Sequence, residues 1–233
     1  MIRIIPSADR FHADNGWLDA RWHFSFAHYH DPANTRFGPL RVFNDDLIRP
    51  GGGFAEHGHD NMEIVTIVLA GALRHADSLG HQSVITPGEV QVMSAGRGIR
   101  HSEFNASPTD DVRLMQVWLL PRNRDAPPRY DQKRFDLAAA DNRWTPLVSD
   151  GSIPGALTID QDASFHRARL TPAGETSWST SPRRRVYLFV IDGSIELNGQ
   201  TLGTGDQARI ESEPHLTLRG GENGADLLLI DLP

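Results

Sequence analysis

Residues 51–63 of the chain read GGGFAEHGHDNME, and residues 96–103 read GRGIRHSE. The two stretches carry four candidate metal ligands, namely His57, His59, His101 and Glu103. In a β-strand, side chains two residues apart point to the same face, with Cα atoms roughly 6–7 Å apart. Both pairs can therefore reach one ion if their strands face each other inside a small barrel. Three imidazoles and one carboxylate suit a divalent first-row metal and leave positions open for water, dioxygen or substrate.

A second carboxylate, Glu63, competes for the same role. It has the same parity as His57 and His59, so it can also face inward. If Glu63 binds the ion, Glu103 becomes a base beside the ligands, and both carboxylates are candidate catalytic residues. A single His-x-His is common by chance in a chain with 11 histidines. The second pair, which follows two glycines at 96 and 98, is much harder to assign to chance.

The composition excludes several classes of function. The 233 residues hold 23 Lys and Arg against 30 Asp and Glu, a net charge of −7, and no Cys. A net-acidic chain lacks the electrostatic footprint for direct, sequence-independent nucleic-acid binding. Without cysteine there are no disulfides, zinc–thiolate sites or thiol catalysis. The N-terminus lacks the apolar core of a signal peptide, and the longest apolar stretch, 64–70, is too short to span a membrane. We therefore expect a soluble, cytoplasmic protein without a membrane partner.

Many short β-branched runs between glycines and prolines predict an all-β fold, a sandwich or barrel. The best helix candidate is the short segment Asp136–Asp141. The predicted strands are Arg41–Asn44, Met62–Leu69, Gly80–Ile85, Glu89–Met93, Arg113–Leu120, Leu157–Asp160, Phe165–Leu170, Val186–Val190, Ser194–Leu197, Gln207–Ile210, Leu216–Leu218 and Leu227–Leu232.

The chain divides into two similar halves. Residues 121–145 are rich in proline and arginine and show no strand-like alternation, which is typical of a connector. We predict an N-terminal metal-binding barrel at 1–120, a connector at 121–150 and a C-terminal barrel at 151–233. The stretch VLAGAL at 68–73 is similar to VIDGSI at 190–195, and the turn PGE at 87–89 to TGD at 204–206. The matching order of these features indicates a degenerate internal repeat.

The motif with His57, His59 and Glu63, followed by Gly71, resembles the first motif of the cupin superfamily. The continuation GIRHSE at 98–103 is similar to the pirin family, and so are the blocks NGWL at 15–18, FSFA at 24–27, LRV at 40–42, NDD at 44–46 and PRY at 128–130. The resemblance covers essentially the whole chain. It extends to the bacterial pirin-like proteins called quercetin 2,3-dioxygenases.

This resemblance implies a bicupin of two jelly-roll β-barrels with few short helices. It implies one divalent ion, held by His57, His59, His101 and Glu103 in the N-terminal barrel, and a degenerate C-terminal barrel without a metal site. Superposing Gly193 on Gly71 places Ser179, Ser181 and Arg185 where His57, His59 and Glu63 stand. His166 and His215 are single and suit packing or surface roles. Gly58 stands where the family often has proline, which loosens the backbone between two ligands.

The resemblance also implies a function: cleavage of a flavonol such as quercetin with dioxygen and release of carbon monoxide. A bound metal lowers the pKa of a coordinated hydroxyl. A carboxylate must then take the proton; Glu103 is the first candidate and Glu63 the second. Phe26, His28 and Met62 are candidates to line the substrate pocket, with core packing favoured for Phe26 and Met62.

Two other classes stay open. One is a non-enzymatic, metal- and redox-sensing regulator with a protein partner; the other is a cupin isomerase. Fe(II) is the favoured ion, and Zn, Ni, Co, Mn or Cu also suit the ligand set.

Overall fold

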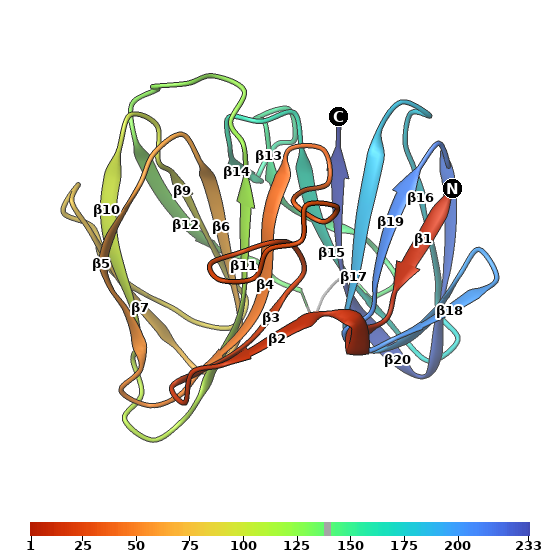
Figure 1. The fold of residues 1–233 in the computed structure, drawn as a ribbon. Coiled ribbons are helices and arrows are strands. Elements are labelled where there is room, and N and C mark those ends of the chain that lie inside the picture. Colours follow the sequence, from red (N-terminus) through yellow and green to blue (C-terminus); the bar gives the residue numbers. More distant parts are fainter. Residues whose placement is uncertain (138–140) are drawn as a thin grey trace. The chain divides into compact units, whose positions relative to one another are not determined.

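The computed structural model of the protein describes residues 1–137 and 141–233 (Figure 1). Over these residues the chain is almost entirely β-strand, with a single turn of 3-10 helix, η1 (Ser7–Asp9). The prediction of an all-β, two-barrel fold is confirmed. The predicted helix Asp136–Asp141 includes residues outside the described ones. No helix among the described residues is both long and apolar enough to cross a membrane.

Contacts divide the chain into two compact units. The N-terminal unit comprises Phe11–Phe135 and Leu157–Gln161, and the C-terminal unit comprises Met1–Arg10, Asp136–Ala156 and Asp162–Pro233. The first residues belong to the C-terminal unit because β1 (Ile2–Ile5) pairs with β19 (Gln207–Glu211). The domain ranges 1–120, 121–150 and 151–233 stay a prediction. The N-terminal compact unit starts at Phe11 rather than at residue 1, and it continues to Phe135 rather than ending at residue 120.

The N-terminal unit contains a large and a small antiparallel sheet. The large sheet has the order β12-β9-β6-β11-β4-β3-β2. Its strands are β2 (Phe11–Asp14), β3 (Leu18–Trp22), β4 (Leu40–Ile48), β6 (Glu63–Ala70), β9 (Glu89–Ser94), β11 (Val112–Leu119) and β12 (Arg129–Arg134). The small sheet has the order β5-β10-β7-β8. Its strands are β5 (Gly53–His59), β7 (Leu73–Asp77), β8 (Gln82–Ile85) and β10 (Ile99–Asn105). The short β14 (Leu157–Thr158) also lies in this unit.

The strands of the C-terminal unit belong to one antiparallel sheet and are fewer than those of the N-terminal unit. Its central order is β19-β17-β20-β15, with β16 and β18 paired to the far ends of β20 and β17. Besides β1 and β19, its strands are β13 (Thr145–Ser149), β15 (Ser164–Leu170), β16 (Glu175–Ser179), β17 (Arg185–Leu197), β18 (Gln200–Gly203) and β20 (His215–Leu232). Strands β17 and β20 are long enough for each to pair with two shorter strands, β17 with β19 and β18, and β20 with β15 and β16.

The same glycine turn occurs in both units. Gly71 and Gly193 have φ angles of +72° and +79°, in the left-handed region that favours glycine. A Cβ on Gly71 would lie 2.3 Å from the carbonyl oxygen of Asp111, and one on Gly193 would lie 2.2 Å from that of Gly224. Each glycine is therefore required both by its turn and by the close approach of the next central strand.

Strand β12 lies inside the stretch predicted to be a connector. It pairs along its length with β9, from Arg129 opposite Ser94 to Arg134 opposite Glu89. Its sequence, RYDQKR, is mostly polar and its side chains are largely exposed. An edge strand of this kind has no apolar alternation, because backbone pairing rather than burial holds it.

Candidate metal centre

Two neighbouring strands bring the predicted ligands together. His57 on β5 lies directly opposite His101 on β10, and His59 lies opposite Ile99. A β-bulge in β5 shifts the register between His101 and Glu103. Gly53 lies at this end of β5, and a Cβ there would come within 2.5 Å of the Glu103 backbone oxygen. The glycine-rich entry to β5 therefore lets the two backbones approach closely beside the site.

The three histidine rings form a compact group. The ring centroids of His57 and His101 lie 4.5 Å apart, those of His57 and His59 4.8 Å, and those of His59 and His101 4.9 Å. One ring nitrogen from each side chain lies within 4.8 Å of the other two. A second group with the same spacing joins His101 to Glu103 and His75. His101 is common to both groups, so it joins the pair His57 and His59 to Glu103.

The ring nitrogens of this group fit a bound cation. His57 Nδ1 donates a hydrogen bond of 2.8 Å to the Ala55 carbonyl, which leaves Nε2 with a free lone pair. His59 Nε2 and both nitrogens of His101 are buried and have no hydrogen-bond partner. Buried polar atoms are normally paired, so an unpartnered nitrogen on each of two neighbouring rings indicates a ligand that pairs with both rings.

Burial also keeps the imidazoles neutral. It lowers the pKa of His59 to about 4, with a further contribution from His57. Burial and the neighbouring His57 lower the pKa of His101 to about 2. Only a neutral imidazole can donate a lone pair to a metal ion. Both side chains are therefore ready to act as ligands at neutral pH.

Glu103 is held from the opposite sheet. Gln116 on β11 donates hydrogen bonds of 2.9 and 3.2 Å from Nε2 to the two Glu103 carboxylate oxygens. Thr66 on β6 donates to Gln116 Oε1 at 2.8 Å, which fixes the orientation of the amide. Burial raises the pKa of Glu103 to about 7, although the Gln116 hydrogen bonds oppose the shift. The carboxyl group is thus fixed in position and titrates near neutrality.

The structure does not bring Glu63 to this group. Glu63 is buried, and its Oε2 accepts a hydrogen bond of 2.7 Å from Ser94. On β6 it lies on the face opposite Thr66, because the two positions differ by an odd number of residues. The shared parity with His57 and His59 does not place it with them, because the turn at 60–62 separates the strands. Burial raises the pKa of Glu63 in this separate place.

A cavity of about 460 Å³ opens beside His57 and Glu103. Its volume lies in the usual range for small-molecule sites. The wall is mostly aromatic, with Trp17, Trp22, Phe26, Phe54 and Trp118. Four polar side chains of the large sheet and its surroundings also line it, namely Asn15, Asn44, Asp46 and Gln116. The cavity can therefore enclose a flat, largely apolar ligand against the ligand group.

Two of the three proposed pocket residues line this cavity. Phe26 and His28 do so, and Phe26 also packs against the core of the unit. Met62 instead packs against a separate small cluster with Ile64 and Met93. The other His-x-His, at 28 and 30, joins no group with metal-ligand spacing among the described residues.

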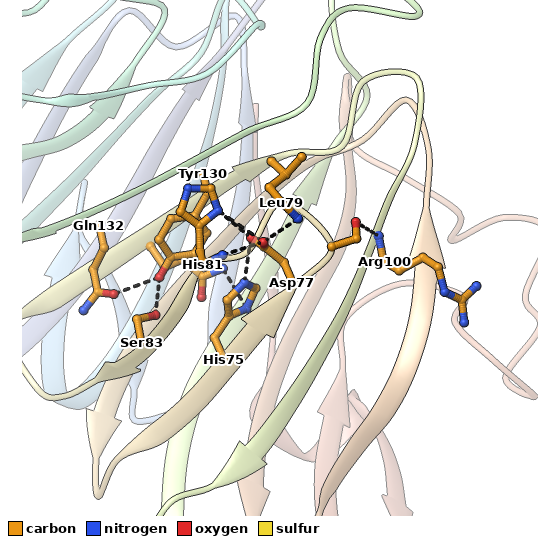
Figure 2. Close-up of polar contacts among 10 residues, drawn as sticks. His75, Asp77, Leu79, His81, Ser83, Arg100, Tyr130 and Gln132 are labelled. Atoms are coloured by element: carbon orange, nitrogen blue, oxygen red, sulfur yellow. Dashed lines mark hydrogen bonds and ion pairs between the residues drawn. The ribbon is translucent and has the colours of Figure 1, made fainter.

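His75, which the sequence pattern did not single out, lies next to His101, with ring centroids 5.3 Å apart. Figure 2 shows its network: Asp77 accepts from His75 Nε2 at 3.3 Å and contacts His81 Nδ1 at 3.0 Å. Burial alone would raise the pKa of Asp77, but hydrogen bonds from the His81 backbone and from His75 outweigh it and lower the pKa. The ring of Tyr130 stacks on both His75 and His81. Leu73, His75 and Asp77 alternate along the sequence and would share one face of a strand, but no strand was predicted there.

Comparisons with known proteins agree with this geometry. Residues 6–119 match the Pirin family, and residues 147–232 match the quercetinase C-terminal cupin domain. Quercetin 2,3-dioxygenase of Escherichia coli (strain K12) is 40% identical over 234 residues, which cover 100% of this chain and 99% of the relative. A pirin-like protein of Caulobacter vibrioides is 41% identical over 94% of each chain.

Solved structures give the same result. The crystal structure of YhhW from Escherichia coli superposes with a TM-score of 0.95 at 39% identity, covering 100% of this chain and 98% of that one. The complex of bacterial pirin YhhW with nickel(II) gives a TM-score of 0.94 at 39% identity, covering 100% and 99%. With full-length relatives at 40% identity and the same arrangement of strands, this chain belongs to the pirin family.

Proposed function

We propose that this protein is a metal-dependent dioxygenase that cleaves a flavonol such as quercetin with dioxygen and releases carbon monoxide. The observation that carries the proposal is the group of three histidines, with Glu103 beside His101, next to an aromatic cavity of about 460 Å³ whose wall includes His57 and Glu103. The name of the Escherichia coli relative, quercetin 2,3-dioxygenase, supports the assignment. A cavity beside the metal ligands is what an enzyme needs and a purely regulatory metal site does not.

The ligands in this proposal are His57, His59, His101 and Glu103. The unpartnered nitrogens of His59 and His101 support it, and so does the hydrogen bond that leaves His57 Nε2 free. The nickel complex of bacterial pirin YhhW supports a divalent ion. We propose Fe(II) as the native ion; Zn, Ni, Co, Mn and Cu are the alternatives, because all tolerate nitrogen and oxygen ligands.

Glu103 acts as the base in this scheme, rather than Glu63. When bound, the metal ion supplies Lewis acidity that lowers the pKa of a coordinated substrate hydroxyl. Glu103 takes the proton of the flavonol 3-hydroxyl on a carboxylate oxygen. Proton transfer of this kind needs a carboxylate within hydrogen-bond reach of the hydroxyl, and Glu103 lines the same cavity. Gln116 holds both carboxylate oxygens during the transfer and so fixes the direction from which the proton arrives.

The aromatic wall positions the substrate and excludes water. Trp118 meets the His59 ring edge-on, with centroids 4.7 Å apart, and meets Phe26 in the same manner at 5.4 Å. Rings fixed in this way present rigid faces to a planar ligand. A flavonol held between them would offer its 3-hydroxyl to the ligand group.

The test is carbon monoxide release from quercetin in air. The metal-free protein is reloaded with Fe(II) and then with each alternative ion, beside His101→Ala as the blank. We expect release that needs both metal and His101, with one dioxygen consumed for each carbon monoxide. A metal-free, active His101→Ala protein would contradict the scheme. Full metal occupancy with no release for any ion would favour the regulator with a protein partner, or an isomerase.

A further inference from the structure

Two buried oxygen atoms in the wall of the cavity lack partners. Asn44 and Asp46 are each only 3% exposed, and both line the cavity that His57 and Glu103 also line. Neither Asn44 Oδ1 nor Asp46 Oδ1 has a hydrogen-bond partner. A buried acceptor left unpaired is destabilising, because it has lost its hydrogen bonds to water. Two such atoms side by side therefore point to a ligand that pairs with them.

The strand places both side chains on one face. Asn44 and Asp46 are two residues apart on β4, so both point into the barrel. Asn44 lies directly opposite Gln116, the residue that holds Glu103. The neighbouring Asp45 points the other way and pairs with Arg113 at 3.0 Å. The unpartnered oxygens thus belong to the cavity and not to the outer face of the sheet.

The neighbouring buried side chain of Gln116 differs from Asn44 and Asp46, because all of its polar atoms have hydrogen-bond partners. Gln116 uses both ends of its amide, accepting from Thr66 and donating to Glu103. In the C-terminal unit, strand β15 corresponds to β4, and its equivalent positions are His166 and Ala168. His166 pairs with Ser164 at 2.9 Å, and Ala168 has no polar side chain at all. The fold itself therefore does not need two free acceptors at these positions.

We infer that Asn44 and Asp46 form a hydroxyl-binding subsite, which selects aromatic substrates carrying ring hydroxyl groups away from the metal-bound end. Phenolic O–H groups donate to the two oxygens, and the aromatic wall covers the ring faces. This inference rests on the proposed function, since it deals with the substrate of the same site. A site built to pair with a hydroxyl rejects the analogue that lacks it far more strongly than an apolar pocket does.

The experiment compares two flavonols that share the 3-hydroxyl and 4-carbonyl. Quercetin has further ring hydroxyls, and 3-hydroxyflavone has none. Binding to the Ni(II)-loaded protein is measured by isothermal titration calorimetry without oxygen, so that turnover does not interfere. We expect the wild type to bind quercetin at least about 10-fold more tightly than 3-hydroxyflavone. Equal affinities would overturn the inference without any variant.

Variants then locate the preference. Asn44→Leu and Asp46→Leu should each weaken quercetin binding about 10-fold and leave 3-hydroxyflavone within about 3-fold of wild type. Asp46→Asn keeps an acceptor oxygen and should keep the preference. Asp45→Asn is the control, because it removes the neighbouring carboxylate on the opposite face and should not change the preference. Nickel content and thermal unfolding verify that each variant is folded.

The outcomes separate the two proposals. A preference that survives both leucine variants overturns the subsite, while carbon monoxide release would leave the dioxygenase assignment intact. If the wild type binds neither flavonol, the proposed function falls and the subsite falls with it. If binding shows the hydroxyl preference but no carbon monoxide is released, the subsite stands and the reaction is a different one.

Discussion

The interiors of the two units differ along one row of residues. In the N-terminal unit the row crosses four strands of the large sheet, with polar residues at Asn44, Gln116, Thr66 and Gln91. The same strand order and pairing in the C-terminal unit gives His166, Leu229, Leu188 and Ala208. The pair Thr66–Gln116, which holds Glu103, thus corresponds to the pair Leu188–Leu229, which belongs to an apolar core.

The strands that carry the histidines differ in the same way from their counterparts in the C-terminal unit. Strands β5 and β10 carry His57 and His101 as a facing pair. Their counterparts, β16 and the first part of β20, place Leu216 and Leu218 in the apolar core. A buried carboxylate such as Glu103 needs paired donors, whereas leucines fill the interior and need none. The comparison teaches that a few inward positions, rather than the strand arrangement, decide whether a barrel of this kind holds a site.

The largest expected effect is loss of the metal ion when a histidine of the N-terminal unit is replaced, but not when one of the C-terminal unit is. His57→Ala should lower the affinity for a divalent ion by at least about 100-fold, because a ligand contributes more than the 10- to 100-fold typical of its supporting residues. Metal content after dialysis, measured by mass spectrometry, checks this. His215→Ala is the control, since His215 is an exposed histidine of the C-terminal unit. Equal metal loss in both variants would contradict the comparison.

The next effect concerns acid stability of the C-terminal unit. Burial lowers the pKa of His166 from 6.5 to about 4. Between these values the unfolded chain binds more protons than the folded one, so stability rises with pH. His166 therefore contributes up to about 3 kcal/mol that is present above pH 6.5 and lost as the pH falls to 4. Chemical denaturation at pH 6.5, 5 and 4 measures it.

The matched variant for this effect is His166→Gln. Glutamine can keep a hydrogen bond to Ser164 but does not titrate. Its free energy of unfolding should therefore fall less than that of the wild type over the same pH range. An identical pH profile for both proteins would show that His166 does not titrate as described.

A reciprocal exchange of the row residues tests the comparison directly. Gln116→Leu introduces the C-terminal residue type beside Glu103, and the loss of a supporting hydrogen bond should weaken metal binding about 10- to 100-fold. Leu229→Gln places an unpaired amide in an apolar core and should lower the free energy of unfolding by about 1–3 kcal/mol without creating a metal site. Metal titration and denaturation measure the two variants. Unchanged metal affinity in Gln116→Leu would remove Gln116 from the supporting role.

The smallest effect concerns the backbone between two candidate ligands. Gly58 does not have a positive φ, and a Cβ there would meet nothing closer than 3.8 Å. Gly58→Ala should therefore raise the free energy of unfolding by about 0.4–1 kcal/mol, by restricting the unfolded chain. Gly71→Ala is the contrasting variant, because its Cβ would lie 2.3 Å from a backbone oxygen and should destabilise the protein. A destabilised Gly58→Ala protein would show that the flexibility of Gly58 is needed.

Local sequence patterns were enough to predict the all-β fold and the repeat of a glycine turn. They also singled out His57, His59, His101 and Glu103; the structure groups the three histidines and brings Glu103 beside His101. These features depend on local patterns: β-branched runs between glycines, and ligand pairs spaced two residues apart on a strand. Such patterns are visible without knowing which strands are neighbours.

The surroundings of those four residues depend on long-range strand pairing. The local sequence around Gln116, His75 and Asp46 does not show that these polar side chains approach the site. They approach the site because strands far apart in sequence pair in a particular register. Glu63 shows the converse, because its spacing suggested the site and the turn after His59 carried it to another face. Register and strand order depend on long-range packing, so they fix the supporting residues that local spacing cannot identify.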